Sequence, residues 1–269
     1  MVSTLAAVIG LIAVASYSAG TLLQVRTYRN NTLEPSGLLL AAAVIGATLH
    51  GIANYLIVYS GGRLYLGLQT SLSLVSWIML VFLLLANLRL PLSNLLILVL
   101  PAAILGVISL LTAPPESALH VASLSDPLIW HIFISIVAYS ILFMAACQSV
   151  LLAVVEYRLK QKRTRLLRLL PPLQTMETLL FDLLWAGIVV LTLAIGSGFI
   201  FLDDMFEQRV VHHTVLSLAS WILYAVLLAG HHLLGWRGTT AVRWTLIAFT
   251  LLVLGYFGSK FVIEVLLEG

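Results

Sequence analysis

Four of the seven histidines in this chain form two adjacent pairs, one at each end of a single apolar run. His212 and His213 precede the run, and His231 and His232 follow it. Neutral imidazole binds metals at physiological pH and is the usual axial ligand of haem iron. At about 1.5 Å of rise per residue, a helix would place His213 and His231 about 27 Å apart, close to the ~30 Å thickness of a bilayer's hydrocarbon core. No single haem could be held by both ends, so the pairs predict two separate sites.

The other candidate ligands are His50 and His131. His50 lies halfway along its own apolar run, where a polar side chain is costly and therefore a functional candidate. His131 begins a run on the same expected membrane face as His213, so these two could clamp a porphyrin between helices. His50, alone or with His231, could hold a second haem. The alternative is that histidines only mark the membrane–water interface. It stays open for His131 and His213, and it is the preferred interpretation for His120, His212 and His232.

The elements that must position these histidines are membrane-spanning helices. Of the 269 residues, 61% are hydrophobic and 9% are charged, whereas a soluble domain carries about a quarter charged residues. Eight apolar segments are long enough to span a bilayer, and lipid offers their backbones no hydrogen-bond partners outside a helix. Their expected ranges are 2–23, 38–59, 64–85, 92–111 (interrupted by Pro101), 128–157, 179–201, 211–230 and 242–267. We therefore expect an all-α polytopic membrane protein, with one transmembrane domain over residues 1–269.

The basic residues predict the orientation of these helices. Of the fourteen Lys and Arg residues, those that follow the first, third, fifth and seventh segments are Arg26, Arg29, Arg89, Arg158, Lys160, Lys162, Arg163, Arg165, Arg168, Arg237 and Arg243. The positive-inside rule places these ends in the cytoplasm and both termini outside. The run 158–168 is interpreted as the main determinant of topology and not as a nucleic-acid or lipid-headgroup patch. The first segment lacks a basic leader and a cleavage site, so we expect a retained span.

The sequence carries no motif that predicts catalysis. GxSxG, P-loop and HExxH patterns are absent, and the single cysteine, Cys147, excludes disulfides, CxxC chemistry and thiolate zinc sites. Asn54 lies one turn beyond His50 and either orients its imidazole or hydrogen-bonds a neighbouring helix. Lys260 and Glu264 are spaced to form a structural ion pair, or, in a third hypothesis, to serve a proton- or cation-coupled transporter.

Five segments resemble a known family. They are "SGGRLYLGLQTSLSLVSW" (60–77), residues 129–160, residues 170–198, "HHTVLSLASWILYAVLL" (212–228) with the following "GWRG", and "YFGSKFV" (256–262). The chain resembles the cytochrome c assembly superfamily that includes CcsA, CcmC and HemX, and most closely its YpjD-type inner-membrane branch. The resemblance implies a multi-pass protein of the bacterial inner membrane that handles haem at the outer face for cytochrome c maturation.

The resemblance carries over to particular histidines. His50 matches the family's first membrane histidine and His131 its outer haem-facing histidine, whereas His231 lies close to the second membrane histidine but not in strict register. The tryptophan-rich "WGxxWxWD" segment is absent, and "FIFLDDMFEQRVVHH" stands in its place. The family's second outer histidine is also missing, and Lys260 lies in that region. His213 could substitute for it, which is an inference from this sequence and not from the family.

Two hypotheses about function follow. The first is a haem-binding or haem-passing membrane protein without catalytic chemistry of its own, whose partners are the lipid bilayer, haem and a cytochrome c maturation component. The second is an accessory or regulatory subunit that has lost haem and serves a transport system for magnesium or cobalt. The missing tryptophan-rich segment favours the second hypothesis, and the histidines favour the first.

Overall fold

The computed structural model describes residues 4–30, 37–60, 63–90, 92–113, 119–120, 126–161, 170–201 and 211–258. Within these ranges, 8 helices are long and apolar enough to cross a membrane, which confirms the predicted number of spans. The chain divides into two compact units. Unit 1 comprises Met1–Ser123 and Arg163–Pro171, and unit 2 comprises Leu124–Lys162 and Pro172–Gly269. The single transmembrane domain expected from the sequence stays a prediction.

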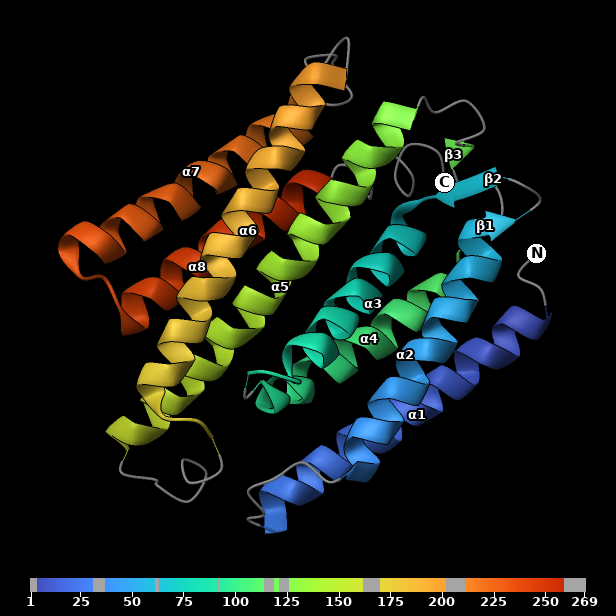
Figure 1. Cartoon of the computed structure of the whole chain (residues 1–269), viewed down its shortest axis with the longest axis horizontal. Helices are drawn as coiled ribbons and strands as arrows, with labels where there is room; N and C mark the ends of the chain where they lie inside the picture. The colour runs from blue at the N-terminus through green and yellow to red at the C-terminus, as the bar shows by residue number, and fades with distance from the viewer. Residues whose placement is uncertain are drawn as a thin grey trace. The chain divides into compact units, whose positions relative to one another are not determined.

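Unit 1 contains α1 (Thr4–Asn30), α2 (Gly37–Val58), α3 (Leu68–Ala86) and α4 (Leu96–Leu111), with a 3₁₀ turn, η1 (Ser93–Leu95), before α4. Helix α1 packs against α2 and α4, and α3 packs against α4 and α2 (Figure 1). Pro101 lies in the second turn of α4 and does not interrupt it. Spanning helices tolerate proline where neighbouring groups satisfy the freed carbonyl.

Three short strands in unit 1 were not expected from the sequence. Strands β1 (Tyr59–Ser60), β2 (Arg63–Leu66) and β3 (Leu119–His120) pair antiparallel in that order. The third helix therefore begins at Leu68 and not at residue 64. Two glycines separate β1 from β2 in the sequence, as tight hairpins prefer. The Gly67 N–H donates to the Thr70 hydroxyl at 2.8 Å, which defines the start of α3.

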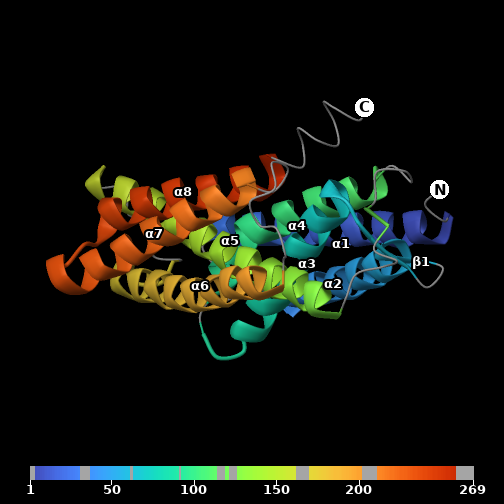
Figure 2. The same cartoon turned by 90° about the horizontal axis from the view of Figure 1, so that it is seen from above.

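Unit 2 contains α5 (Asp126–Lys160), α6 (Leu173–Phe201), α7 (Val211–Leu234), α8 (Gly238–Val253) and a π-helical turn, η3 (Leu254–Gly258). Helix α5 packs against α6 and α8, and α7 packs against α8 and α6, as Figures 1 and 2 show. Helix α6 begins six residues before the predicted residue 179, and α7 continues past the predicted residue 230. His231 and His232 are therefore in the last turn of α7 and not beyond its end.

Side-chain hydrogen bonds to backbone carbonyls join neighbouring helices in both units. The donors and acceptors are Ser16 Oγ to Ala42 O (2.9 Å), Trp77 Nε1 to Ala47 O (2.7 Å), Gln148 Nε2 to Met176 O (2.9 Å) and Ser220 Oγ to Ala248 O (2.8 Å). Such bonds between membrane helices contribute about 0.6 to 2 kcal/mol each. They fix the registers in which the candidate histidines lie.

Candidate functional site

The turn between α7 and α8 has a backbone that glycine makes possible. Gly235 and Gly238 have φ angles of 68° and 53°, in the left-handed region where other residues are strained. The Trp236 N–H donates to the Gly230 carbonyl at 3.1 Å. The Trp236 ring packs so closely on Gly230 that a Cβ there would overlap it. The "GWRG" segment thus folds back onto the last turn of α7.

This turn holds His231 in one tautomer. The His231 Nδ1 atom lies 2.8 Å from the Trp236 carbonyl oxygen. A carbonyl oxygen only accepts, so Nδ1 carries the hydrogen and the lone pair of the neutral ring is on Nε2. Metal-binding histidines are oriented in this way, with one ring N–H donated to a carbonyl or carboxylate. The Nε2 lone pair of His231 is thus the one that a ligand bond would use.

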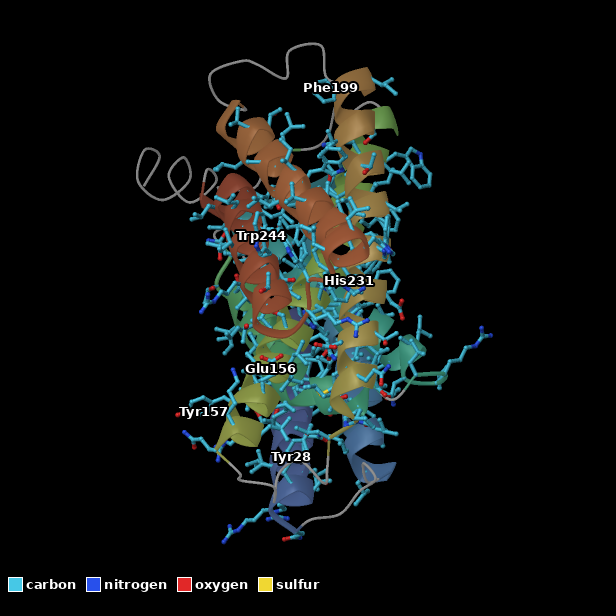
Figure 3. The ribbon with its side chains drawn as sticks, turned by 90° about the vertical axis from the view of Figure 1, so that its left-hand side faces the viewer. Tyr28, Glu156, Tyr157, Phe199, His231 and Trp244 are labelled. Carbon is cyan, nitrogen blue, oxygen red and sulfur yellow. The ribbon has the colours of Figure 1, made fainter. Side chains whose placement is uncertain are left out.

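Aromatic side chains lie against the His231–His232 pair and acidic side chains lie against the turn, in the region of the labels His231, Trp244 and Glu156 in Figure 3. The Phe181 ring stacks on His231 with centroids 3.5 Å apart and an interplanar angle of 18°. Trp185 lies 5.8 Å from His232 and Trp236 lies 5.2 Å from Trp244, measured between ring centroids. The first N–H of α8, at Gly238, donates to Glu177 Oε1 at 3.0 Å. Helix α6 thus supports both His231 and the turn that orients it.

His131, near the start of α5, shows the same arrangement. Its Nδ1 atom lies 2.9 Å from the Ser197 hydroxyl, which donates its own hydrogen to the Ala194 carbonyl at 2.8 Å. The Ser197 oxygen therefore accepts from His131, and the Nε2 lone pair is again available. Trp130 and Phe133 flank this histidine in the sequence, 62% and 51% exposed, with their rings edge to face. They offer exposed apolar ring surface at this end of α5.

His213, at the other end of α7 from His231, contacts a different part of unit 2. Its ring lies edge-on to Tyr256, with centroids 5.6 Å apart, and Tyr256 lies 5.5 Å from Tyr139. His131 and His213 thus belong to the same unit but have different partners. The side chains of His120, His212, Lys260 and Glu264 lie outside the part of the chain that the structure describes.

His50 lies in unit 1 and is 0% exposed. Its Nε2 atom lies 2.8 Å from the Ser73 hydroxyl, which donates to Asn54 Oδ1 at 2.8 Å. The Ser73 oxygen therefore accepts from Nε2–H, and the Nδ1 lone pair accepts from the Tyr17 hydroxyl at 3.2 Å. Both ring nitrogens are engaged inside the unit. Of the two alternatives for Asn54, the structure shows the hydrogen bond to a neighbouring helix: Asn54 accepts from Ser73 of α3 and reaches His50 only through it.

Sequence reasoning missed the groups that orient the ligands. Ser197 lies between two glycines and carries no sequence signal of a role in orienting a histidine, and Phe181, Trp185 and Trp236 were not considered. The signal for the α7–α8 turn was the pair of glycines that flank Trp-Arg after a histidine pair. Among the described residues, no group of three or more His, Cys, Asp or Glu side chains could hold a metal ion by itself.

The sequence of this chain is similar to those of several known proteins. The chain is 36% identical over 224 residues to an "Uncharacterized 28.8 kDa protein in nifR3-like 5'region" of Azospirillum brasilense, covering 81% of this chain and 82% of that protein. It is 34% identical over 149 residues to "Inner membrane protein YpjD" of Escherichia coli K12, covering 55% of this chain and 56% of that protein. The chain thus spans about half the length of these YpjD relatives. No solved structure matches the chain.

Eight spans and these relatives define a multi-pass protein of the bacterial inner membrane. The family described as "Cytochrome C assembly protein" matches residues 39–267. The chain belongs to the cytochrome c assembly protein family. The family resemblance inferred from the sequence is therefore confirmed.

Proposed function

We propose that the protein binds haem through His131 and His231 and passes it on during cytochrome c assembly, without catalytic chemistry of its own. The observation that carries this proposal is the shared state of the two imidazoles. Each donates its Nδ1 hydrogen to a fixed acceptor, Ser197 Oγ or Trp236 O, and each keeps its Nε2 lone pair. Membership of the cytochrome c assembly family supports haem as the group that uses these lone pairs.

The residues of unit 2 fit haem in their donor chemistry. Haem supplies an iron with axial positions that imidazole nitrogen fills. The protein supplies fixed imidazoles. It also supplies apolar ring surface from Trp130 and Phe133, which flank His131 in the sequence, and from Trp185, which lies against His232, the neighbour of His231. His213 is proposed as a second ligand at the His131 end, where the family's tryptophan-rich segment is missing from the sequence.

His50 is proposed as a ligand of a different kind. Both of its ring nitrogens are engaged by Tyr17 and Ser73, so iron could bind only after one hydrogen bond is given up. Because iron binding at His50 would break a hydrogen bond, we expect His50 to bind iron more weakly than His131 or His231. We expect His50 to contribute least to haem retention among the four candidates.

The proposed orientation puts His131 and His213 at the outer face and His231 at the cytoplasmic face. Arg158 and Lys160 end α5, and Arg237 and Arg243 flank the start of α8. The positive-inside rule assigns these ends to the cytoplasm, and both termini to the outside. Haem would then be accepted at one face and released at the other, or held at both.

The test is to purify the protein from haem-replete cells and to record its absorption spectrum. A Soret band in the purified protein, or one that develops when hemin is added, is the expected result. A colourless protein that also fails to bind hemin would refute the proposal. The hypothesis of a magnesium or cobalt transport subunit is distinguished by deletion: normal c-type cytochromes with altered metal sensitivity would support it, whereas loss of c-type cytochromes supports cytochrome c assembly.

A further inference from the structure

Two buried hydroxyl groups in the seam between α7 and α8 have no hydrogen-bond partner among the described residues. They are the phenol of Tyr224 and the hydroxyl of Thr245, and both side chains are 0% exposed. A buried hydroxyl without a partner is unfavourable, and in folded proteins such groups are nearly always paired with protein or water. The arrangement therefore needs a partner that these residues do not supply.

The residues Tyr224 and Thr245 lie at the same level of the α7–α8 helix pair. The Ser220 hydroxyl of α7 donates to the Ala248 carbonyl of α8 at 2.8 Å, which sets the register of this packed helix pair. Because the two helices are joined by a short turn, they run antiparallel. One turn further along α7 is Tyr224, and about one turn back along α8 is Thr245.

Thr245 differs from other threonines in the helices of this protein. A helical threonine usually satisfies its hydroxyl by donating to the carbonyl four residues earlier. Thr250, on the same helix, donates to the Leu246 carbonyl at 2.8 Å, and Thr192 on α6 donates to the Ile188 carbonyl at 2.7 Å. Thr245 does not make this bond within its own helix. Its hydroxyl is therefore available to another partner.

The surroundings are polar but uncharged. Ser217 and Ser220 lie on the same buried face of α7 as Tyr224. The Tyr139 phenol of α5 donates to the Leu252 carbonyl at 3.2 Å. Glu177 is engaged by Gly238, two turns before Thr245 on α8. A neutral ligand with both donor and acceptor capacity matches this environment, because two hydroxyls without a carboxylate do not neutralise a cation.

We propose that Tyr224 and Thr245 form a binding site for an internal water molecule inside unit 2. Water can donate to one hydroxyl and accept from the other, and buried waters in proteins make about three hydrogen bonds of this kind. An apolar ligand would leave both hydroxyls unpaired. The site does not depend on haem, because it uses neither the imidazoles nor the turn that orients His231.

The direct test is footprinting with X-ray-generated hydroxyl radicals on the whole protein in a lipid nanodisc. Tyr224 should be oxidised several-fold faster than Tyr17, because a bound water supplies the radical beside it. Tyr17 is the matched control, since it is also 0% exposed but its phenol contacts His50. The substitution Thr245→Val should reduce the rate at Tyr224 to that at Tyr17. Equal rates in the wild type, or no effect of Thr245→Val, would overturn the proposal.

The unfolding midpoint of the protein provides a second test, because a dry seam and a bridging water predict changes of opposite sign. If the seam were dry, Tyr224→Phe and Thr245→Val would each remove an unpaired hydroxyl and raise the midpoint. A bridging water predicts the opposite: each single variant lowers the midpoint, and the double variant lowers it by less than the sum. The control Thr250→Val removes a hydroxyl already bonded within α8. A raised midpoint for both single variants, or fully additive losses, would contradict the proposal.

Discussion

The Nδ1 atom of His231 donates a hydrogen bond to the Trp236 carbonyl oxygen at 2.8 Å, across the turn that joins α7 to α8. This bond links the chemistry of an imidazole to the conformation of a backbone segment. The turn needs two glycines with positive φ, and it is anchored to α6 through Glu177. Changes in the turn should therefore alter both the stability of unit 2 and the orientation of His231.

The two turn glycines should differ only slightly in their sensitivity to substitution. Gly235 has open space around its Cα, so Gly235→Ala should cost only the backbone penalty, about 1 kcal/mol of unfolding free energy. Gly238→Ala adds a Cβ 2.5 Å from Glu156 Oε1, the end of a flexible side chain, so any additional loss is the small cost of turning that carboxylate aside. Reversible unfolding in mixed detergent measures both. Equal losses of unfolding free energy in the two variants would show that the Glu156 contact does not contribute.

Glu177 should stabilise unit 2 by accepting from the first N–H of α8. Hydrogen bonds to charged groups contribute about 1.5 to 3 kcal/mol, and partial exposure of Glu177 should reduce this to about 1 kcal/mol. Glu177→Ala removes the acceptor, whereas Glu177→Gln keeps an oxygen at the same place and should recover part of the loss. The measurement is the unfolding free energy of the two variants. Identical values would mean that the bond to Gly238 does not contribute.

Ser73 should be the most sensitive member of the His50 network. Ser73→Ala leaves the His50 Nε2–H and the Asn54 Oδ1 unpaired, because the hydroxyl bridges the two groups. We expect a loss of about 1 to 2 kcal/mol in unfolding free energy. Thr48→Val is the control, since Thr48 is exposed on the same unit and bonds only within its own helix. A loss no larger than that of the control would contradict the bridging role.

Gly46 should be required for the position of Tyr17. A Cβ at Gly46 would overlap the Tyr17 ring, whose phenol contacts His50. Gly46→Ala should therefore cost about 1 to 3 kcal/mol through overpacking. Gly196→Ala is the control, because a Cβ there would meet nothing within 4 Å. If both variants unfold alike, Tyr17 adjusts freely and does not hold His50.

Much of the architecture was predictable because a bilayer leaves few options. Long apolar runs must become helices, and all eight predicted spans are present. The predicted start at residue 64 was wrong because apolar content does not distinguish the residues of strand β2 from a helix. The start of α6 was missed by six residues because the polar first turn of that helix lacks the hydropathy of a span.

The sequence supplied the candidate ligands, which stay predictions, but not the orientation of their rings. Depth and family resemblance singled out His50, His131, His213 and His231. Whether a ring nitrogen is available depends on partners far away in sequence, such as Ser197 for His131, 66 residues away. Periodicity does not reveal such pairs. The two glycines around Trp236 were the one local signal for the tautomer of His231, and they indicate a turn without showing which carbonyl it presents.

The central claim is tested most directly by the haem content and the Soret spectrum of single histidine variants purified in parallel. His232→Ala is the matched control, because His232 adjoins His231 but is exposed and lies outside the bond to Trp236. We expect His131→Ala and His231→Ala each to lower haem per protein at least several-fold or to shift the Soret band, and His232→Ala to match the wild type. Wild-type haem content and spectra in both His131→Ala and His231→Ala would contradict the account.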